Sequence, residues 1–239
     1  KARCQGALDA DGNLVGLKLR ISGQSILAGI MPQALNDGAD MVVFQGLLPS
    51  GVDPRLEDQS IKYTFPTLLV DHAMRNPPVR PGFWRGVNAN QNAIYLECFM
   101  DELAHAAGRD PLEFRLAHLK DSPKMATVLQ AVADKSGWGA DDGLSRGLCC
   151  FYSFGSYTAA CAEVTVSDEG ELKMHRIVAA TDPGYGVNPQ QIDAQVAGSF
   201  VYGLSAMLHQ EITFENGETQ QKNFNTYNSM RIAEMPDVE

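Results

Sequence analysis

The segment from Asn76 to Gly86 places the strongest local limit on how this chain can fold. It reads Asn-Pro-Pro-Val-Arg-Pro-Gly-Phe-Trp-Arg-Gly, and its three prolines and two glycines exclude both a helix and a central strand. A helical pattern follows at about residues 90–107, with a broad apolar stripe and Gly108 just beyond its end. The sequence therefore predicts a stiff irregular loop that runs directly into a long helix.

Three further helices are predicted from their start signals. Asp110-Pro111-Leu112-Glu113 combines an N-cap residue, a proline at the first helical position and an acid at the third. Ser122-Pro123 begins a helix that ends near Gly137, and Asn188-Pro189 begins one that reaches about His209.

Short apolar runs bounded by turn residues predict strands between these helices. The predicted strands are residues 14–21, 67–70, 147–166 and 171–180, with hairpin turns at 167–170 and 216–217. Residues 28–66 hold no sustained period and are interpreted as a long irregular excursion. The pattern predicts an α+β fold in which antiparallel strand hairpins pack with helices.

Length and charge exclude several classes of protein. The 239 residues are 44% hydrophobic, which is enough to build a core without disulfides. A net charge of −10 argues against wholesale nucleic-acid binding, and no apolar run reaches the roughly 18–20 residues of a membrane span. Asp141-Asp142-Gly143 has the composition of a linker, so we predict domains at 1–143 and 144–239, both incomplete.

The common catalytic and metal-binding patterns are weak. No Cys or His pair has the spacing of a zinc site, so no protein ligand to a metal is predicted. Gly184-Tyr185-Gly186 lacks the rest of a dinucleotide fingerprint, and Ser156 lacks the glycines of a nucleophile elbow. Cys98 is predicted to be a small core residue, and Cys149 and Cys150 to face opposite sides of a strand.

Two segments carry residues suited to binding a ligand. In the first, residues 82–91, Arg85 lies between bulky aromatic residues and a glycine, where a guanidinium could bind an anion. The alternative is that Trp84 fills the core and Arg85 pairs with a surface acid. In the second, Gln195, Gly198 and Ser199 share one helix face, which suits either a ligand or tight helix packing.

The second of these segments and three further motifs follow Phe83-Trp84-Arg85-Gly86 in a recognisable order. They are Glu97-Cys98-Phe99-Met100-Asp101-Glu102-Leu103-Ala104, Gly108-Arg109-Asp110-Pro111-Leu112-Glu113-Phe114-Arg115, Ala160-Cys161-Ala162-Glu163-Val164, and Asn188-Pro189 with Gln195-x-x-Gly198. In this order and spacing, together with Phe83-Trp84-Arg85-Gly86, they resemble the molybdenum hydroxylases of the xanthine dehydrogenase and aldehyde oxidase family. The nearest resemblance is to molybdopterin-binding beta subunits of the isoquinoline 1-oxidoreductase or nicotinate dehydrogenase type.

The resemblance implies a reaction, a cofactor and a partner. Members of this family hydroxylate aldehydes or N-heteroaromatic compounds with oxygen from water, at a molybdenum held by molybdopterin. In bacteria the cofactor is commonly the cytosine dinucleotide form, and electrons leave through an iron–sulfur subunit or domain. The implied fold is that of the molybdenum-binding domains of xanthine dehydrogenase-like proteins.

The resemblance also implies roles for particular residues. Trp84, Arg85, Gly86, Gln195 and Gly198 would bind the cofactor, and Val87 would face the substrate. The family's catalytic glutamate is expected beyond Glu239, so no catalytic residue is assigned, and a glycine-rich loop is expected before Lys1. We therefore expect a central fragment that holds no cofactor and has no activity by itself.

A second hypothesis comes from a different class of function. The chain could be a structural or interaction domain that binds the iron–sulfur subunit and has neither cofactor nor activity. The full gene distinguishes the two hypotheses, since only the first requires a downstream glutamate motif. The sequence leaves bacterial cytoplasm and periplasm equally open, together with the identity of the substrate.

Overall fold

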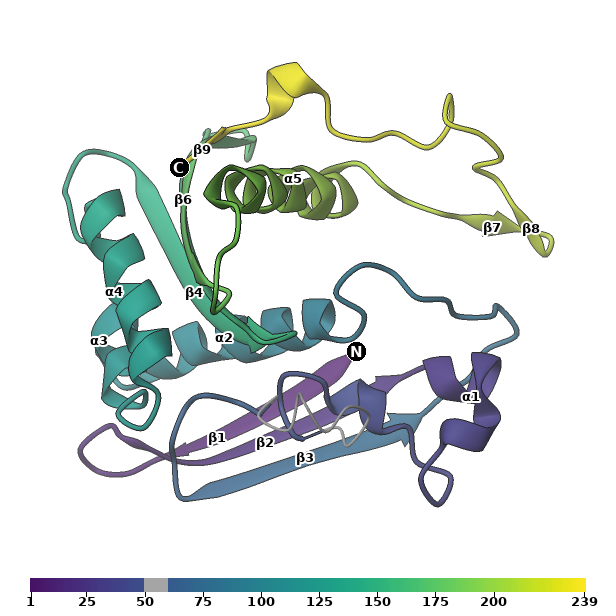
Figure 1. The fold of residues 1–239 in the computed structure, drawn as a ribbon, viewed down its shortest axis with the longest axis horizontal. Helices are drawn as coiled ribbons and strands as arrows, with labels where there is room; N and C mark the ends of the chain where they lie inside the picture. The colour runs from purple at the N-terminus through teal and green to yellow at the C-terminus, as the bar shows by residue number, and fades with distance from the viewer. Residues whose placement is uncertain (50–59) are drawn as a thin grey trace. The chain divides into compact units, whose positions relative to one another are not determined.

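The computed structural model describes residues 1–49 and 60–239 (Figure 1). The chain forms two compact units. Unit 1 comprises residues 1–138, 148–160 and 180–184, and unit 2 comprises residues 139–147, 161–179 and 185–239. The polypeptide passes between the units several times. The predicted domain boundary at 143/144 stays a prediction, because compact units need not coincide with whole domains.

Unit 1 contains a three-stranded sheet in the order β1-β2-β3. Strand β1 (Ala2–Leu8) pairs antiparallel with β2 (Leu14–Gly23), and β2 pairs parallel with β3 (Thr67–Met74). The strands predicted at 14–21 and 67–70 are thus confirmed and extended. Strand β1 escaped prediction because its small and polar residues do not alternate clearly with apolar ones.

The segment between β2 and β3 contains short helices. They are α1 (Ile26–Ile30) and the 3-10 helices η1 (Pro32–Ala34) and η2 (Met41–Phe44). Buried Asp40 organises this region, because its carboxylate accepts hydrogen bonds from Ser25 Oγ and from the amides of Leu27 and Val42. Part of the predicted excursion, residues 50–59, lies outside the described residues.

Three helices complete the main body of unit 1. They are α2 (Ala89–Ala106), α3 (Pro111–Ala117) and α4 (Pro123–Ser136). Helix α2 buries Leu96, Met100 and Leu103, and Leu103 lies against Gly6 of β1, where a side chain would collide with it. The predicted caps are confirmed at Asp110, which accepts from two α3 amides, and at Gly137, whose φ is +67°.

A four-stranded sheet has the order β4-β5-β6-β9. Its strands are β4 (Ser145–Ser153), β5 (Ser156–Val166), β6 (Leu172–Asp182) and β9 (Asp237–Val238). The prediction of a single strand over 147–166 is wrong, because Phe154 and Gly155 adopt φ values of +50° and +82° and turn the chain. The predicted turn at 167–170 is confirmed by the bond from the Gly170 amide to the Ser167 carbonyl.

Helix α5 (Pro189–Leu208) belongs to unit 2 and begins where predicted. Asn188 caps it by accepting from the Gln191 amide, yet among the described residues it buries only Leu204 and Ser205. The hairpin of β7 (Phe214–Glu215) and β8 (Glu218–Thr219) follows, with the predicted Asn216-Gly217 turn, and then η4 (Ile232–Glu234). Among the described helices, none is long and apolar enough to cross a membrane.

Candidate functional site

The irregular loop of residues 76–86 ends in a tight turn that leads into α2. The Val87 amide donates to the Trp84 carbonyl at 2.8 Å, and the Ala89 amide donates to the Gly86 carbonyl at 2.9 Å. Gly86 and Val87 both have left-handed backbones, with φ values of +79° and +50°. Glycine adopts this region freely, whereas a β-branched residue there carries strain of about 1–3 kcal/mol.

Three asparagines at the start of α2 hold the surrounding main chain. Asn90 donates from Nδ2 to the carbonyls of Arg85 and Val87. Asn88 donates to Val42, and Asn92 donates to both Val43 and Gln45. Asn90 therefore fixes the turn itself, while Asn88 and Asn92 attach the helix to residues 42–45, which include most of η2. These roles were not predicted, because they depend on contacts that the sequence pattern does not show.

The side chains of the predicted loop site lie at the surface of unit 1. Trp84 is 40% exposed, which rules out the alternative in which it fills the core. Arg85 is also exposed, and Val87 is half-buried. A guanidinium at such a position is accessible to an anion, and its N–H donors lie in one plane, so that two of them can bind one anion together.

A cavity of about 260 Å³ opens beside this loop within unit 1. Trp84 and Val87 line it, together with Gln91 and Tyr95 of α2 and His72 of β3. His72 Nε2 lies 3.2 Å from the Gly23 carbonyl oxygen, which favours a proton on that nitrogen. The spacing of Gln91 and Tyr95, one helical turn apart, is the sequence signal that could have placed both on this wall.

Gln195 and Gly198 lie on α5 in unit 2, and both are exposed. A Cβ added at Gly198 would meet no atom within 4 Å, so the tight helix packing considered for this glycine is not found among the described residues. Ser199 donates instead to the carbonyl of Val196. The loop residues and the α5 residues belong to different units, so their meeting in one site stays a prediction.

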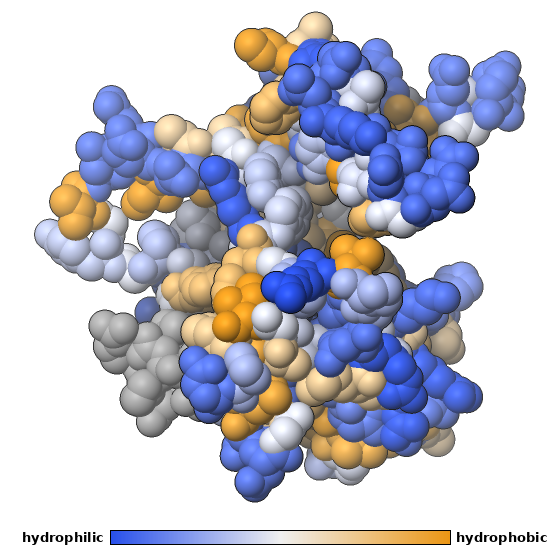
Figure 2. All heavy atoms as spheres, turned by 90° about the vertical axis from the view of Figure 1, so that its right-hand side faces the viewer, coloured by the Kyte–Doolittle hydropathy of each residue, from blue (hydrophilic) through white to orange (hydrophobic). Residues whose placement is uncertain are grey.

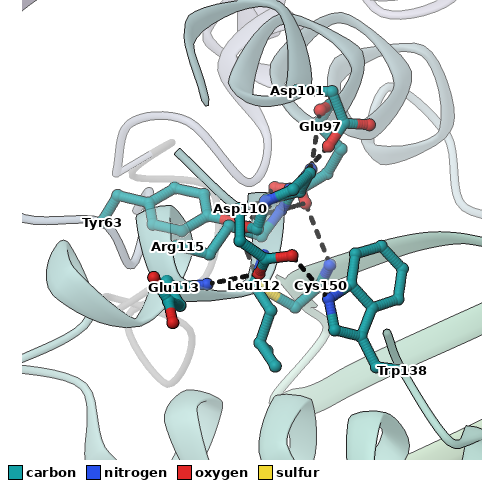
Figure 3. A network of polar contacts seen from close by, with 10 residues as sticks. Tyr63, Glu97, Asp101, Asp110, Leu112, Glu113, Arg115, Trp138 and Cys150 are labelled. Carbon is teal, nitrogen blue, oxygen red and sulfur yellow. Dashed lines mark hydrogen bonds and ion pairs between the residues drawn. The ribbon is translucent and has the colours of Figure 1, made fainter. Parts of the chain in front are cut away.

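A buried polar network in unit 1 joins α2, α3 and β4 (Figure 3). Glu97 accepts from Arg115 Nε at 3.0 Å, from the Tyr63 hydroxyl at 2.9 Å and from the Cys150 amide at 3.0 Å. The Arg115 side chain is completely buried and also binds Asp101 at 2.6 Å. Burial raises the pKa of the Glu97 carboxyl, and the adjacent Arg115 charge opposes that rise.

A second carboxylate cluster lies within unit 2. Buried Glu163 accepts from Arg146 at 3.2 Å and from two nitrogens of Arg176 at 2.7 and 3.0 Å. The hydrogen bonds from Arg176 lower the pKa of Glu163. Arg146 also binds Asp142 through two hydrogen bonds, which lower the pKa of Asp142 to about 2. Both clusters are structural ion-pair networks that reasoning from the sequence missed.

The exposure of the cysteines tests two smaller predictions. Cys150 is buried and Cys149 exposed, so their predicted placement on opposite sides of a strand is confirmed. Cys98 is exposed, so its predicted place in the core is wrong. The inward-facing position on this part of α2 is occupied by its neighbour Glu97, which is buried. Within residues 1–49 and 60–239, no group of three or more His, Cys, Asp or Glu side chains is arranged to hold a metal ion.

Comparison with known proteins identifies the family. Residues 100–236 match the family described as the molybdopterin cofactor-binding domain. The chain belongs to this family. The match spans α3, α4, strands β4, β5 and β6, and α5, and therefore takes in most of the motifs on which the resemblance rests.

Relatives of this member of the molybdopterin cofactor-binding domain family are bacterial oxidoreductase subunits. The beta subunit of isoquinoline 1-oxidoreductase from Brevundimonas diminuta is 27% identical over 237 residues, which cover 97% of this chain. A nicotinate dehydrogenase subunit from Pseudomonas putida is 28% identical in an alignment over 260 residues that covers 98% of this chain. The alignments cover only 29% and 21% of those two proteins, so the chain corresponds to a minor part of each.

A solved structure supports the fold of this family member. Quinoline 2-oxidoreductase from Pseudomonas putida 86 matches all of this chain and 54% of its own, with a TM-score of 0.75 and 11% sequence identity. At this identity the likeness concerns the fold alone. It agrees with the predicted mixture of sheets and helices.

The donors on the two units suit a molybdopterin group chemically. Such a group carries phosphate, and the exposed guanidinium of Arg85 is a bidentate phosphate donor. The exposed amide of Gln195 offers both a donor and an acceptor to a pterin edge. The open space over Gly198 would allow a ligand to approach the α5 backbone.

Proposed function

We propose that this chain is the central part of the molybdopterin-binding subunit of an oxidoreductase. The enzyme hydroxylates aldehydes or N-heteroaromatic compounds with oxygen from water and passes the electrons to an iron–sulfur subunit. The observation that carries the proposal is the rigid turn at Gly86 and Val87, which holds Arg85 in an accessible position beside a cavity in a molybdopterin-binding family member. The names of the two relatives support the N-heteroaromatic class of substrate.

The side chains of this chain would bind and orient the reactants. Arg85 would neutralise an anionic part of the cofactor, and Gln195 would hydrogen-bond the pterin or its phosphate-bearing part, in the cytosine dinucleotide form. Gly86 and Gly198 would allow close approach of the backbone, and Val87 would bound the substrate. When bound, the cofactor supplies the molybdenum centre that accepts two electrons from the substrate. The general base is a glutamate expected outside these 239 residues.

The test is to purify the full-length protein together with its iron–sulfur partner. Molybdenum should be present at about one atom per copy of the full-length protein, and acid hydrolysis should release cytidine monophosphate. Aldehydes and N-heteroaromatic compounds should be oxidised, with ¹⁸O from labelled water in the product. A protein that carries iron–sulfur clusters but no molybdenum would contradict the proposal.

A second candidate function is supported by the surface of unit 2. Large apolar side chains are exposed there, including Tyr185, Val187, Phe224 and Ile232, the last at 97%. On the face drawn in Figure 2, apolar and hydrophilic side chains lie interspersed. If a protein partner covered these large side chains, unit 2 would act as an interaction domain that binds the iron–sulfur subunit without a cofactor of its own. Retention of the partner by a protein without molybdenum would favour this function.

A further inference from the structure

The turn that presents Arg85 and Val87 is held by one side chain. Asn90 Nδ2 donates to the carbonyls of both residues, the one to Val87 at 3.2 Å. The same carboxamide covers Gly86, since a Cβ there would lie 2.8 Å from Asn90 Cγ. Asn90 therefore contacts all three residues of the turn, from the first turn of α2.

The turn needs such support because its backbone is strained. Val87 has a φ of +50°, a region that β-branched residues rarely occupy. Strained conformations persist only where the surroundings determine them. Two main-chain hydrogen bonds lie within the turn, donated by the amides of Val87 and Ala89. Each of them fixes only one carbonyl group. Asn90 ties the carbonyls on both sides of Gly86 to one rigid helical position.

We propose that Asn90 is a positioning residue, which fixes the direction of the Arg85 and Val87 side chains by locking the left-handed Gly86–Val87 turn. This inference rests on the proposed function, because the two side chains matter for catalysis only if they face the cofactor and substrate. Asn90 itself acts through the main chain. Its loss would leave the turn free to relax toward an ordinary right-handed or extended backbone.

Two substitutions separate the hydrogen bonds of Asn90 from its helical role. Asn90→Ala removes the carboxamide but favours the helix. Asn90→Asp keeps the shape and favours the helix N-terminus by its charge, yet it has no N–H to donate. Asn92→Ala is the matched control, because Asn92 also donates twice from Nδ2, but to Val43 of η2 and to Gln45 just after it.

The experiment measures amide hydrogen exchange in the full-length protein and turnover per bound molybdenum. Both Asn90 variants should speed exchange at Val87 and Ala89 roughly tenfold, because two hydrogen bonds of ordinary strength are lost. They should also lower kcat by a similar factor. Asn92→Ala should speed exchange in residues 41–45 and leave the turn amides as in wild type.

Each result decides between the possibilities. Unchanged exchange at Val87 and Ala89 in both Asn90 variants would overturn the proposal. Faster exchange with wild-type kcat would also overturn it, since the turn would then not position a group that the reaction needs. If the wild-type protein holds no molybdenum, the proposed function fails, while the exchange data still report whether Asn90 locks the turn.

Discussion

At the scale of single residues, Arg85 and Gln195 combine an exposed polar group with a rigid support. Arg85 extends from a turn closed by main-chain hydrogen bonds, and Gln195 from the interior of a 20-residue helix. A ligand that binds them encounters side chains whose backbones are already ordered, so less entropy is lost on binding. Substitutions at either position should affect binding and catalysis more than folding.

Replacement of Arg85 by lysine tests whether the paired N–H donors of the planar guanidinium are needed. Lysine keeps the charge but cannot form two parallel hydrogen bonds with one phosphate. We expect turnover of the full-length enzyme, per molybdenum, to fall about tenfold or more, which corresponds to about 1.4 kcal/mol. The melting temperature should barely change. Steady-state kinetics checks this, and wild-type turnover would show that Arg85 forms only a surface ion pair.

Replacement of Gln195 by alanine tests the contribution of α5. The side chain is exposed and alanine favours a helix, so folding should be unaffected. If the amide bonds the cofactor in a dry pocket, its loss should weaken binding by about 1–3 kcal/mol and lower the molybdenum content. Metal analysis measures the molybdenum content, and thermal melting measures whether folding is affected. Normal occupancy with a collapsed melting temperature would favour a packing role instead.

At the scale of elements, buried ion pairs hold the helices and strands of each unit in place. Glu97 of α2 bonds Arg115 of α3 and the backbone of β4, so one carboxylate fixes three elements. Glu163 of β5 binds Arg176 of the adjacent strand β6 and Arg146 of β4. Such pairs are weak evidence for net stability, but the removal of one partner is costly because the other charge stays buried.

Substitution of Glu97 by glutamine should therefore destabilise unit 1 strongly. Arg115 would remain buried, with the exposed Asp101 as its remaining carboxylate partner. We expect a loss of about 3–5 kcal/mol in the free energy of unfolding. Denaturation of the full-length protein measures it. Asp71→Asn, which breaks the exposed Arg20–Asp71 pair, is the control and should change stability little.

The Glu163 cluster predicts a dependence on pH. Because Arg176 lowers the pKa of Glu163 in the folded state, its ionised form stabilises unit 2. That contribution is complete above the ordinary value of 4.5 and is lost as the pH falls through the lower folded-state pKa. Glu163→Gln should thus be less stable than wild type at pH 7, and the difference should shrink below pH 4.5. A constant difference between pH 7 and pH 3 would contradict this.

The elements themselves were largely predictable because their signals are local. Asp110, Asn188 and Gly137 cap helices through contacts within four residues, which a sequence displays directly. The turn at Phe154 was missed because phenylalanine is an unusual residue at a positive φ. The Glu97 network was missed because an acid on a helix is usually solvated, and its partners lie far along the sequence.

The residues of the candidate site likewise divide into those that the sequence could predict and those that it could not. Trp84, Arg85 and Gly86 could be singled out from composition and from a family resemblance, since both are visible as a string of residues. The role of Asn90 could not, because it depends on the strained φ of Val87 and on the direction of an amide group. His72 comes from a strand that lines the same cavity as α2 only in the folded unit.

At the scale of the whole molecule, the proposed cofactor contacts are spread over both units. Arg85 belongs to unit 1 and Gln195 to unit 2, and relatives of this chain are several times longer. A cofactor of nucleotide size needs to be enclosed on most sides to bind tightly. We expect the 239-residue chain, produced by itself, to bind no molybdenum and to oxidise no aldehyde or heteroaromatic compound. Stoichiometric metal in that chain would overturn this expectation.

The parallel pairing of β2 with β3 has a consequence for the order in which the protein forms. Strands β1 and β2 are neighbours in the chain and can pair as soon as both leave the ribosome. Gly16 of β2 pairs with Thr67 of β3, so the other edge of β2 has no partner until the intervening residues have been synthesised. An unpaired strand edge is a template for strands of other molecules. During this interval, therefore, we expect this edge of β2 to be open to strands of neighbouring nascent chains.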